Sequence, residues 1–110
     1  MKPLEGITVL EFSTMITASF AAMMMAEQGA RVIKVEPMNV GDPMRYIGAN
    51  KGGISSLFAN CNRGKQSIRV NLKEQAGQEV SRELVAGVDI FMNNFRPGVM
   101  DKLNLGSEVL

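Results

Sequence analysis

The seven residues NNFRPGV, at positions 93–99, combine several side chains that commonly bind ligands. They follow the apolar run 88–92, which has the length and composition of a buried strand. The amides can donate and accept hydrogen bonds, Phe95 can stack on a flat ring, and Arg96 can hold a phosphate or a carboxylate. Because parallel α/β sheets bind ligands beyond the carboxyl ends of their strands, the segment predicts a ligand-binding loop. The alternative is structural, with a capping asparagine, Phe95 in the core and Arg96 in water.

A second candidate site is the stretch NRGKQSIRVNLK, at positions 62–73, which contains four cations and no acid: Arg63, Lys65, Arg69 and Lys73. Several cations near the ends of a strand favour a phosphate site. Lys73 is also expected to begin a helix, where backbone N–H groups favour an anion. The alternative, a solvated cationic face, fits the spacing equally well.

The composition excludes much catalytic chemistry. The chain has no histidine, so these 110 residues cannot form a Ser-His-Asp triad, a Cys-His dyad or a histidine-ligated metal site, and we expect no metal. The single cysteine, Cys61, rules out an internal disulfide and fits a reducing cytoplasm, and we expect it to be either a small buried residue or an unreactive thiol. A net charge of +1 gives no reason to expect nucleic acid or a membrane surface as a partner. The longest apolar stretch, 20–26, is too short to cross a bilayer, so we expect a soluble, cytoplasmic protein.

The elements that must position these residues alternate along the chain. We expect strands at 6–12, 30–37, 66–72 and 88–92, helices at 18–29, 54–60 and 73–87, a short helix opened by Pro97, and a long loop at 38–53. The helix at 73–87 should bury a stripe of Val80, Leu84 and Val85. The alternation predicts an α/β fold, with an open, mainly parallel, Rossmann-like sheet and flanking helices.

Three further features have ordinary structural interpretations. Glu36 ends the second strand, where dinucleotide-binding folds keep a ribose-binding acid, but the preceding strand-to-helix turn lacks the required glycines. We therefore expect Glu36 to pair with a cation or a helix end. The methionines at 23–25 should fill the core. Ser107 and Glu108 begin a helix that Leu110 cuts short, which suggests the front part of a longer protein.

Five phrases in register give the chain a resemblance to the family III CoA-transferases, which include formyl-CoA transferase, carnitine CoA-transferase and α-methylacyl-CoA racemase. The phrases are PLEGITVLEF, AEQGARVIKVEP, GDPMR, NRGKQSIRVNLK and GVDIFMNNFRPGVMDKLNLG, and they run from about residue 3 to the end. The resemblance implies that residues 1–110 are the N-terminal part of a CoA-binding α/β domain in an interlocked homodimer. It also implies cofactor-binding roles for Val70, Asn71, Leu72, Lys73, Asn94, Phe95, Arg96 and Lys102.

The family chemistry implied by the resemblance uses an aspartate as nucleophile, which attacks an acyl-CoA and becomes an aspartyl-CoA thioester. That aspartate is expected beyond Leu110, so the 110 residues contain no catalytic residue and should be inactive alone. The implied partners are an acyl-CoA and a carboxylic acid acceptor. After the first strand, Thr14 and residues 17–19 depart from the family pattern, which leaves the acyl group open. Two alternatives stay open, a racemase of the same family and a non-catalytic CoA- or nucleotide-binding fragment.

Overall fold

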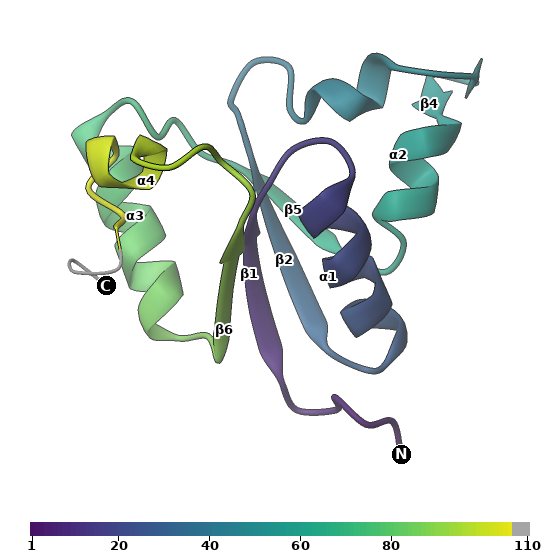
Figure 1. Cartoon of the computed structure of the whole chain (residues 1–110), viewed down its shortest axis with the longest axis horizontal. Coiled ribbons are helices and arrows are strands. Elements are labelled where there is room, and N and C mark those ends of the chain that lie inside the picture. The colour runs from purple at the N-terminus through teal and green to yellow at the C-terminus, as the bar shows by residue number, and fades with distance from the viewer. Residues whose placement is uncertain (107–110) are drawn as a thin grey trace.

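The computed structural model describes residues 1–106, in which four strands form one parallel sheet (Figure 1). The strands are β1 (Thr8–Phe12), β2 (Arg31–Glu36), β5 (Gln66–Arg69) and β6 (Ile90–Asn93), in the order β5-β2-β1-β6. All three pairings are parallel. The predicted open, mainly parallel α/β sheet is confirmed.

Helices cover both faces of this sheet (Figure 1). Helices α1 (Thr17–Glu27) and α2 (Ser56–Cys61) lie on one side, and α3 (Gln75–Ala86) and α4 (Val99–Lys102) lie on the other. None of the helices within residues 1–106 is long and apolar enough to cross a membrane.

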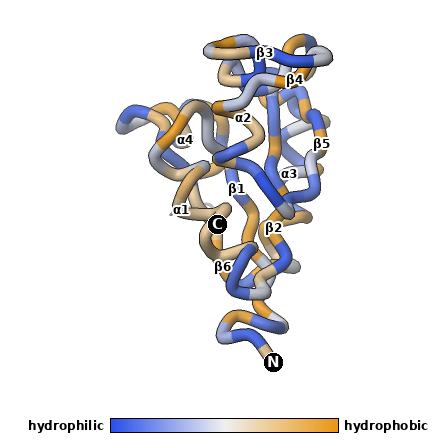
Figure 2. The backbone as a smooth tube through the Cα atoms, turned by 90° about the vertical axis from the view of Figure 1, so that its right-hand side faces the viewer, coloured by the Kyte–Doolittle hydropathy of each residue, from blue (hydrophilic) through white to orange (hydrophobic). Residues whose placement is uncertain are grey.

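Between β2 and α2 the chain makes an excursion, residues 37–55, away from the sheet. It contains the 3-10 helix η1 (Pro43–Tyr46) and a hairpin of β3 (Asn50–Lys51) and β4 (Ile54–Ser55). Figure 2 shows this hairpin at the end of the molecule farthest from the N-terminus. The prediction of a plain loop at 38–53 was therefore wrong, and the helix predicted at 54–60 begins only at Ser56.

Two predicted boundaries also move where β5 leads into α3. The sheet ends at Arg69, apart from one bond of 3.1 Å from the Val70 amide to the Glu36 carbonyl, because the chain then turns at Asn71. Helix α3 begins at Gln75, so Lys73 precedes the helix instead of beginning it. The helix start predicted at Ser107 lies outside the described residues.

The sheet face toward α3 has an apolar centre. Its buried residues include Leu10, Phe12 and Val35, and the Phe12 and Phe91 rings lie 5.2 Å apart. The α3 stripe predicted for this face was partly wrong, since Leu84 and Val85 pack there but Val80 is 47% exposed. Gln78 and Ser81 take the buried positions on that helix, because they share its inner face with Leu84 and Val85.

The sheet face toward α1 changes character along the strands. Its amino half is apolar, with Val9, Ala22 and Val32 buried together. The methionine prediction holds for Met23, which is buried, while Met24 is exposed. In the carboxyl half the inward residues are charged: Glu11, Lys34 and Glu36, each at most 1% exposed. Because strand residues alternate between faces, β2 places Val32, Lys34 and Glu36 on this same side.

Candidate functional site

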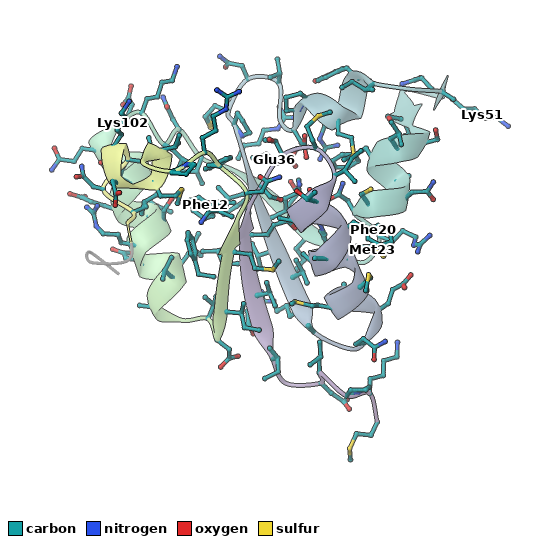
Figure 3. All side chains as sticks on the ribbon, viewed as in Figure 1. Phe12, Phe20, Met23, Glu36, Lys51 and Lys102 are labelled. Carbon is teal, nitrogen blue, oxygen red and sulfur yellow. The ribbon has the colours of Figure 1, made fainter. Side chains whose placement is uncertain are left out.

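A pocket of about 460 Å³ lies beyond the carboxyl ends of β2 and β5. The last residues of β2, the segment 37–40 after it and residues 70–73 after β5 line most of it, and Thr14 and Phe95 line the side toward β1 and β6. Figure 3 labels Glu36 and Phe12, both toward this end of the sheet. The volume falls in the range of small-molecule and cofactor sites. Five of the eight predicted cofactor-binding residues meet here.

The wall formed by Val70 to Lys73 is a turn fixed by its own hydrogen bonds. The Asn71 carboxamide accepts from the Lys73 amide at 3.1 Å, and the Gln78 side chain donates to the Leu72 carbonyl at 2.9 Å. The first turn of α3 approaches so closely that a Cβ on Gly77 would lie 1.9 Å from the Asn71 carbonyl oxygen. A glycine is therefore required at position 77. The Lys73 side chain remains exposed.

Asn94 uses its carboxamide within the protein. It accepts from the Thr14 amide at 3.1 Å and donates to the Thr14 carbonyl at 2.7 Å. These bonds tie the carboxyl ends of β1 and β6 together, where the strand order reverses and such sheets usually keep a crevice. The structural alternative for this loop is thus partly realised, and direct binding of a ligand by Asn94 stays a prediction.

Phe95 and Arg96 are placed differently. Phe95 is half-buried, packs against the α3-side core and lines the main pocket. It also lines a second pocket of about 310 Å³, which the exposed Arg96 lines as well. Among residues 1–106, no carboxylate pairs with Arg96. Lys102 lines neither pocket, and Figure 3 shows it on α4, well apart from Glu36.

The four cations of the stretch 62–73 contact different parts of the chain and do not form one common site among the described residues, so phosphate binding stays a prediction for Lys73 alone. Arg63 pairs with Glu27 at 2.7 Å, and Lys65 is buried and pairs with Glu11 at 2.5 Å. Arg69 donates to the backbone carbonyls of residues 38 and 39. Of the four, only Lys73 lines the main pocket.

Sequence reasoning missed a buried charge network of Glu11, Lys34, Asp42 and Lys65. The Lys34 ammonium lies 2.9 Å from carboxylate oxygens of both Glu11 and Asp42. The Lys65 ammonium pairs with the other Glu11 oxygen, and all four side chains are at most 2% exposed. Burial lowers the pKa of Lys65, and the hydrogen bond and charge of Glu11 oppose that shift. The sequence contained one signal, since Glu11 and Lys34 each interrupt an otherwise apolar strand. In the structure the two residues are register partners on β1 and β2.

Serine hydroxyls complete the contacts of this network. Ser13 and Ser19 both donate to the Glu11 carboxylate, and the Lys34 ammonium donates to the Ser19 hydroxyl at 3.0 Å. It also reaches the Ser13 carbonyl at 3.3 Å. The network therefore connects both central strands to the turn that follows β1.

A second ion pair joins the buried Glu36 to the partly exposed Arg45 through two hydrogen bonds of 2.7 Å. The Glu36 carboxylate also accepts from the Ser67 hydroxyl and from the Asp42 amide at 2.7 Å. Burial alone would raise the pKa of Glu36, but these hydrogen bonds and the Arg45 charge lower it to about 2. The Arg45 guanidinium also lies 4.0 Å from the centre of the Phe58 ring. The expectation of an ion-paired Glu36 is confirmed, and of the two interpretations of Cys61 the buried residue is the one observed.

The chain is similar to characterised CoA-transferases along nearly its whole length. It is 38% identical to an acetyl-CoA:oxalate CoA-transferase of Acetobacter aceti over 98% of this chain and 28% of the relative. It is also 38% identical to the succinyl-CoA:glutarate CoA-transferase of Homo sapiens, over 98% of this chain and 25% of the relative. The chain thus spans about a quarter of the length of these relatives.

Solved structures show the same similarity. A CAIB/BAIF family protein from Brucella suis has a TM-score of 0.90 and 34% identity, over 98% of this chain and 30% of the other. A hypothetical protein from Mycobacterium tuberculosis also has a TM-score of 0.90 and 34% identity, over 99% of this chain and 30% of the other. The model of CoA-transferase family III matches residues 4–110, and the chain therefore belongs to that family.

Proposed function

We propose that this chain supplies the CoA-binding part of an enzyme that moves CoA between carboxylic acids. The main support is the pocket beyond β2 and β5, where the turn Val70 to Lys73 and Phe95 line one cavity. The two relatives described above, each 38% identical to this chain, are named as CoA-transferases. Acyl-CoA and a carboxylic acid acceptor are accordingly the proposed substrates.

The residues around the two pockets suit the parts of CoA. CoA carries phosphates, a flat adenine ring and a long neutral arm. Lys73 and Arg96 are exposed cations on the two pockets, and Phe95 lies on both, so one extended ligand could contact all three. In this proposal Lys73 and Arg96 contact phosphates, and Phe95 packs against the adenine. Asn94 contributes by holding the loop that carries Phe95 and Arg96 against β1. Lys102 contacts the nucleotide only if CoA extends past the second pocket onto α4.

The proposed reaction needs a nucleophilic carboxylate that these residues do not offer in a suitable place. Asp42 is fully buried and paired with Lys34, and Asp89 accepts from the Thr8 amide at the amino ends of the strands. Asp101 lies on α4 and lines the second pocket beside Arg96, where the proposed site holds the nucleotide and not the acyl group. We place the nucleophilic aspartate beyond Leu110, in a homodimeric cytoplasmic enzyme, and we expect residues 1–110 to be inactive alone.

In this mechanism the aspartate attacks the thioester carbonyl of the acyl-CoA. The C–S bond breaks, which gives a mixed anhydride and CoA thiolate. The thiolate then attacks the aspartyl carbonyl, releases the donor carboxylate and leaves an aspartyl-CoA thioester. The acceptor carboxylate reverses the two steps and takes CoA away. The chain described here would hold the nucleotide while these exchanges occur.

The test is to incubate the full-length protein with an acyl-CoA and hydroxylamine. We expect an aspartyl hydroxamate beyond residue 110, found by peptide mass spectrometry. Turnover without any trapped carboxylate, together with exchange of the α-proton into deuterated water, would favour the racemase. A reading frame that ends near Leu110 and a protein that binds CoA without turnover would favour the non-catalytic module. The Lys73→Ala variant should bind CoA more weakly in calorimetry, and Lys51→Ala, on the distant β3–β4 hairpin, should bind as wild type.

A further inference from the structure

Two segments that follow neighbouring strands form walls of the main pocket. The turn 13–16 after β1 contributes Thr14, and the loop 37–41 after β2 contributes residues 37–40. Within the turn, Met15 has a φ of +65°, which is uncommon for a residue with a side chain. Such a conformation persists only when the surrounding structure holds it. The turn therefore needs an anchor.

The Asp42 carboxylate supplies that anchor. Its Oδ1 accepts from the Met15 amide at 3.1 Å and from the Met44 amide at 2.9 Å. Its Oδ2 lies 2.9 Å from the Lys34 ammonium, and the side chain is fully buried. Both oxygens of the carboxylate are thus engaged, one by the turn and η1, and the other by β2.

The backbone of Asp42 holds the other wall. Its amide donates to Glu36 Oε1 at 2.7 Å, which closes the loop 37–41 onto the strand that precedes it. Gly41, just before it, has a φ of +74°, and a Cβ there would lie 2.7 Å from the same Glu36 oxygen. The close approach of loop and carboxylate therefore requires glycine. Asp42 is attached to both walls and lines neither.

We propose that Asp42 is a positioning residue, which holds the turn 13–16 and the loop 37–41 in fixed relation and so sets the shape of the pocket between them. The phrase GDPMR thus acquires a role beyond its likeness to the family: Gly41 permits the approach and Asp42 joins the walls. The choice of CoA as the test ligand rests on the proposed function. The hydrogen bond from the Met15 amide to Asp42 can be tested without it.

The test uses Asp42→Asn in the full-length protein. Asparagine has the same shape but one acceptor oxygen, so its NH2 group must face either the Lys34 ammonium or the Met15 and Met44 amides. In both orientations the negative charge that strengthens the hydrogen bond from the Met15 amide is lost. We expect faster hydrogen exchange in the peptide that spans residues 13–16, and CoA affinity lowered roughly 10- to 100-fold, which corresponds to the loss of about one charge-assisted contact with the ligand. The matched control is Val9→Ala, which removes buried volume in the amino half of the same sheet face. It should lower the thermal unfolding midpoint and leave CoA affinity within about twofold of wild type.

A second variant separates positioning from general destabilisation. Glycine adopts positive φ freely, so Met15→Gly added to Asp42→Asn should restore part of the CoA affinity. Wild-type affinity in folded Asp42→Asn, or unchanged exchange at 13–16, would overturn the proposal. If Asp42→Asn does not fold, hydrogen exchange of the Met15 amide in the wild-type protein provides the test. An exchange rate like that of an exposed amide would refute the hydrogen bond to Asp42, and protection like that of the β1 amides would support it. If wild-type protein fails to bind CoA, the proposed function falls, and the exchange data still judge Asp42.

Discussion

Replacing Lys34 by methionine should be among the most damaging single substitutions in this chain. Lys34 is 1% exposed, and its ammonium pairs with Glu11 and with Asp42, each at 2.9 Å. The buried network contains two ammonium groups and two carboxylates, so its formal charges cancel. Lys34→Met leaves two buried carboxylates and only the Lys65 ammonium. Methionine has nearly the same length, so lost charge and not lost volume dominates the effect.

The expected size of the effect follows from burial. Removing one partner of a buried ion pair costs about 3–5 kcal/mol, because the remaining charge stays dehydrated without compensation. That is a large share of the roughly 5–15 kcal/mol by which native domains are stable. The pair of Arg63 and Glu27 provides the comparison, since its distance is 2.7 Å but both side chains are about half exposed. Exposed pairs contribute only about 0.2–1 kcal/mol. The matched control, Arg63→Met, should therefore change stability little.

The assay is urea unfolding of both variants, followed by circular dichroism, with soluble yield recorded beside it. We expect Arg63→Met to unfold within about 1 kcal/mol of wild type. Lys34→Met should either lose several times as much stability or fail to accumulate as soluble protein. Equal midpoints for the two variants would refute the reasoning, because they would mean that water reaches the network and screens its charges.

Three further predictions follow from the described contacts. Arg96→Ala should weaken CoA binding by about 1.5–3 kcal/mol, or roughly 10- to 100-fold, and less at high salt. Titration calorimetry measures the affinity. The control is Arg31→Ala, which removes a guanidinium at the opposite ends of the strands. Unchanged affinity in folded Arg96→Ala would place Arg96 outside the site. Glu36 has its pKa lowered from 4.5 to about 2, so its stabilising effect is complete above about pH 4.5 and is lost as the pH falls toward 2. Glu36→Gln should flatten that part of the stability profile, and a profile as steep as wild type would show that other carboxylates cause it. Residues 1–110 alone should associate, because β5 and β6 leave sheet edges unpaired within the described part of the chain; a sharp monomeric melt in sedimentation and calorimetry would contradict this.

The sequence predicted the sheet because its strands and helices are marked by strong local signals. The β-branched runs of β1 and β2 and the glycine after α1 determine a βαβ unit without any tertiary information. The predicted boundaries were wrong where local signals compete with contacts. Residues 70–72 alternate like a strand, but the turn at Asn71 and the approach of Gly77 end the sheet at Arg69.

The candidate site was predictable in its location and not in its electrostatics. Parallel topology alone brings the segments after β5 and β6 to one end of the sheet, which is why Lys73 and Phe95 meet at the main pocket. Both the Lys34 and the Lys65 ammonium groups pair with Glu11, which lies 23 positions from the first and 54 (65 minus 11) from the second, and Lys34 has a further partner in Asp42. Spacing within 62–73 carries no information about Glu11. Judged by sequence spacing alone, the four cations of that stretch therefore looked like one continuous cationic patch.

The strand order has a consequence for synthesis on the ribosome. β1 lies in the centre of the sheet, and its two neighbours leave the ribosome at different times: Val9 pairs with Val32 on one side and with Ile90 on the other. The 58 residues between those partners (90 minus 32) take roughly 3–12 s to translate at about 5–20 residues per second. During that interval the backbone N–H and C=O groups on the edge of β1 that later pairs with β6 have no strand beside them, and a nascent chain is most exposed to wrong pairing there. Codons that slow translation between β2 and β6 would lengthen this exposure, whereas pauses after β6 would allow the sheet to close.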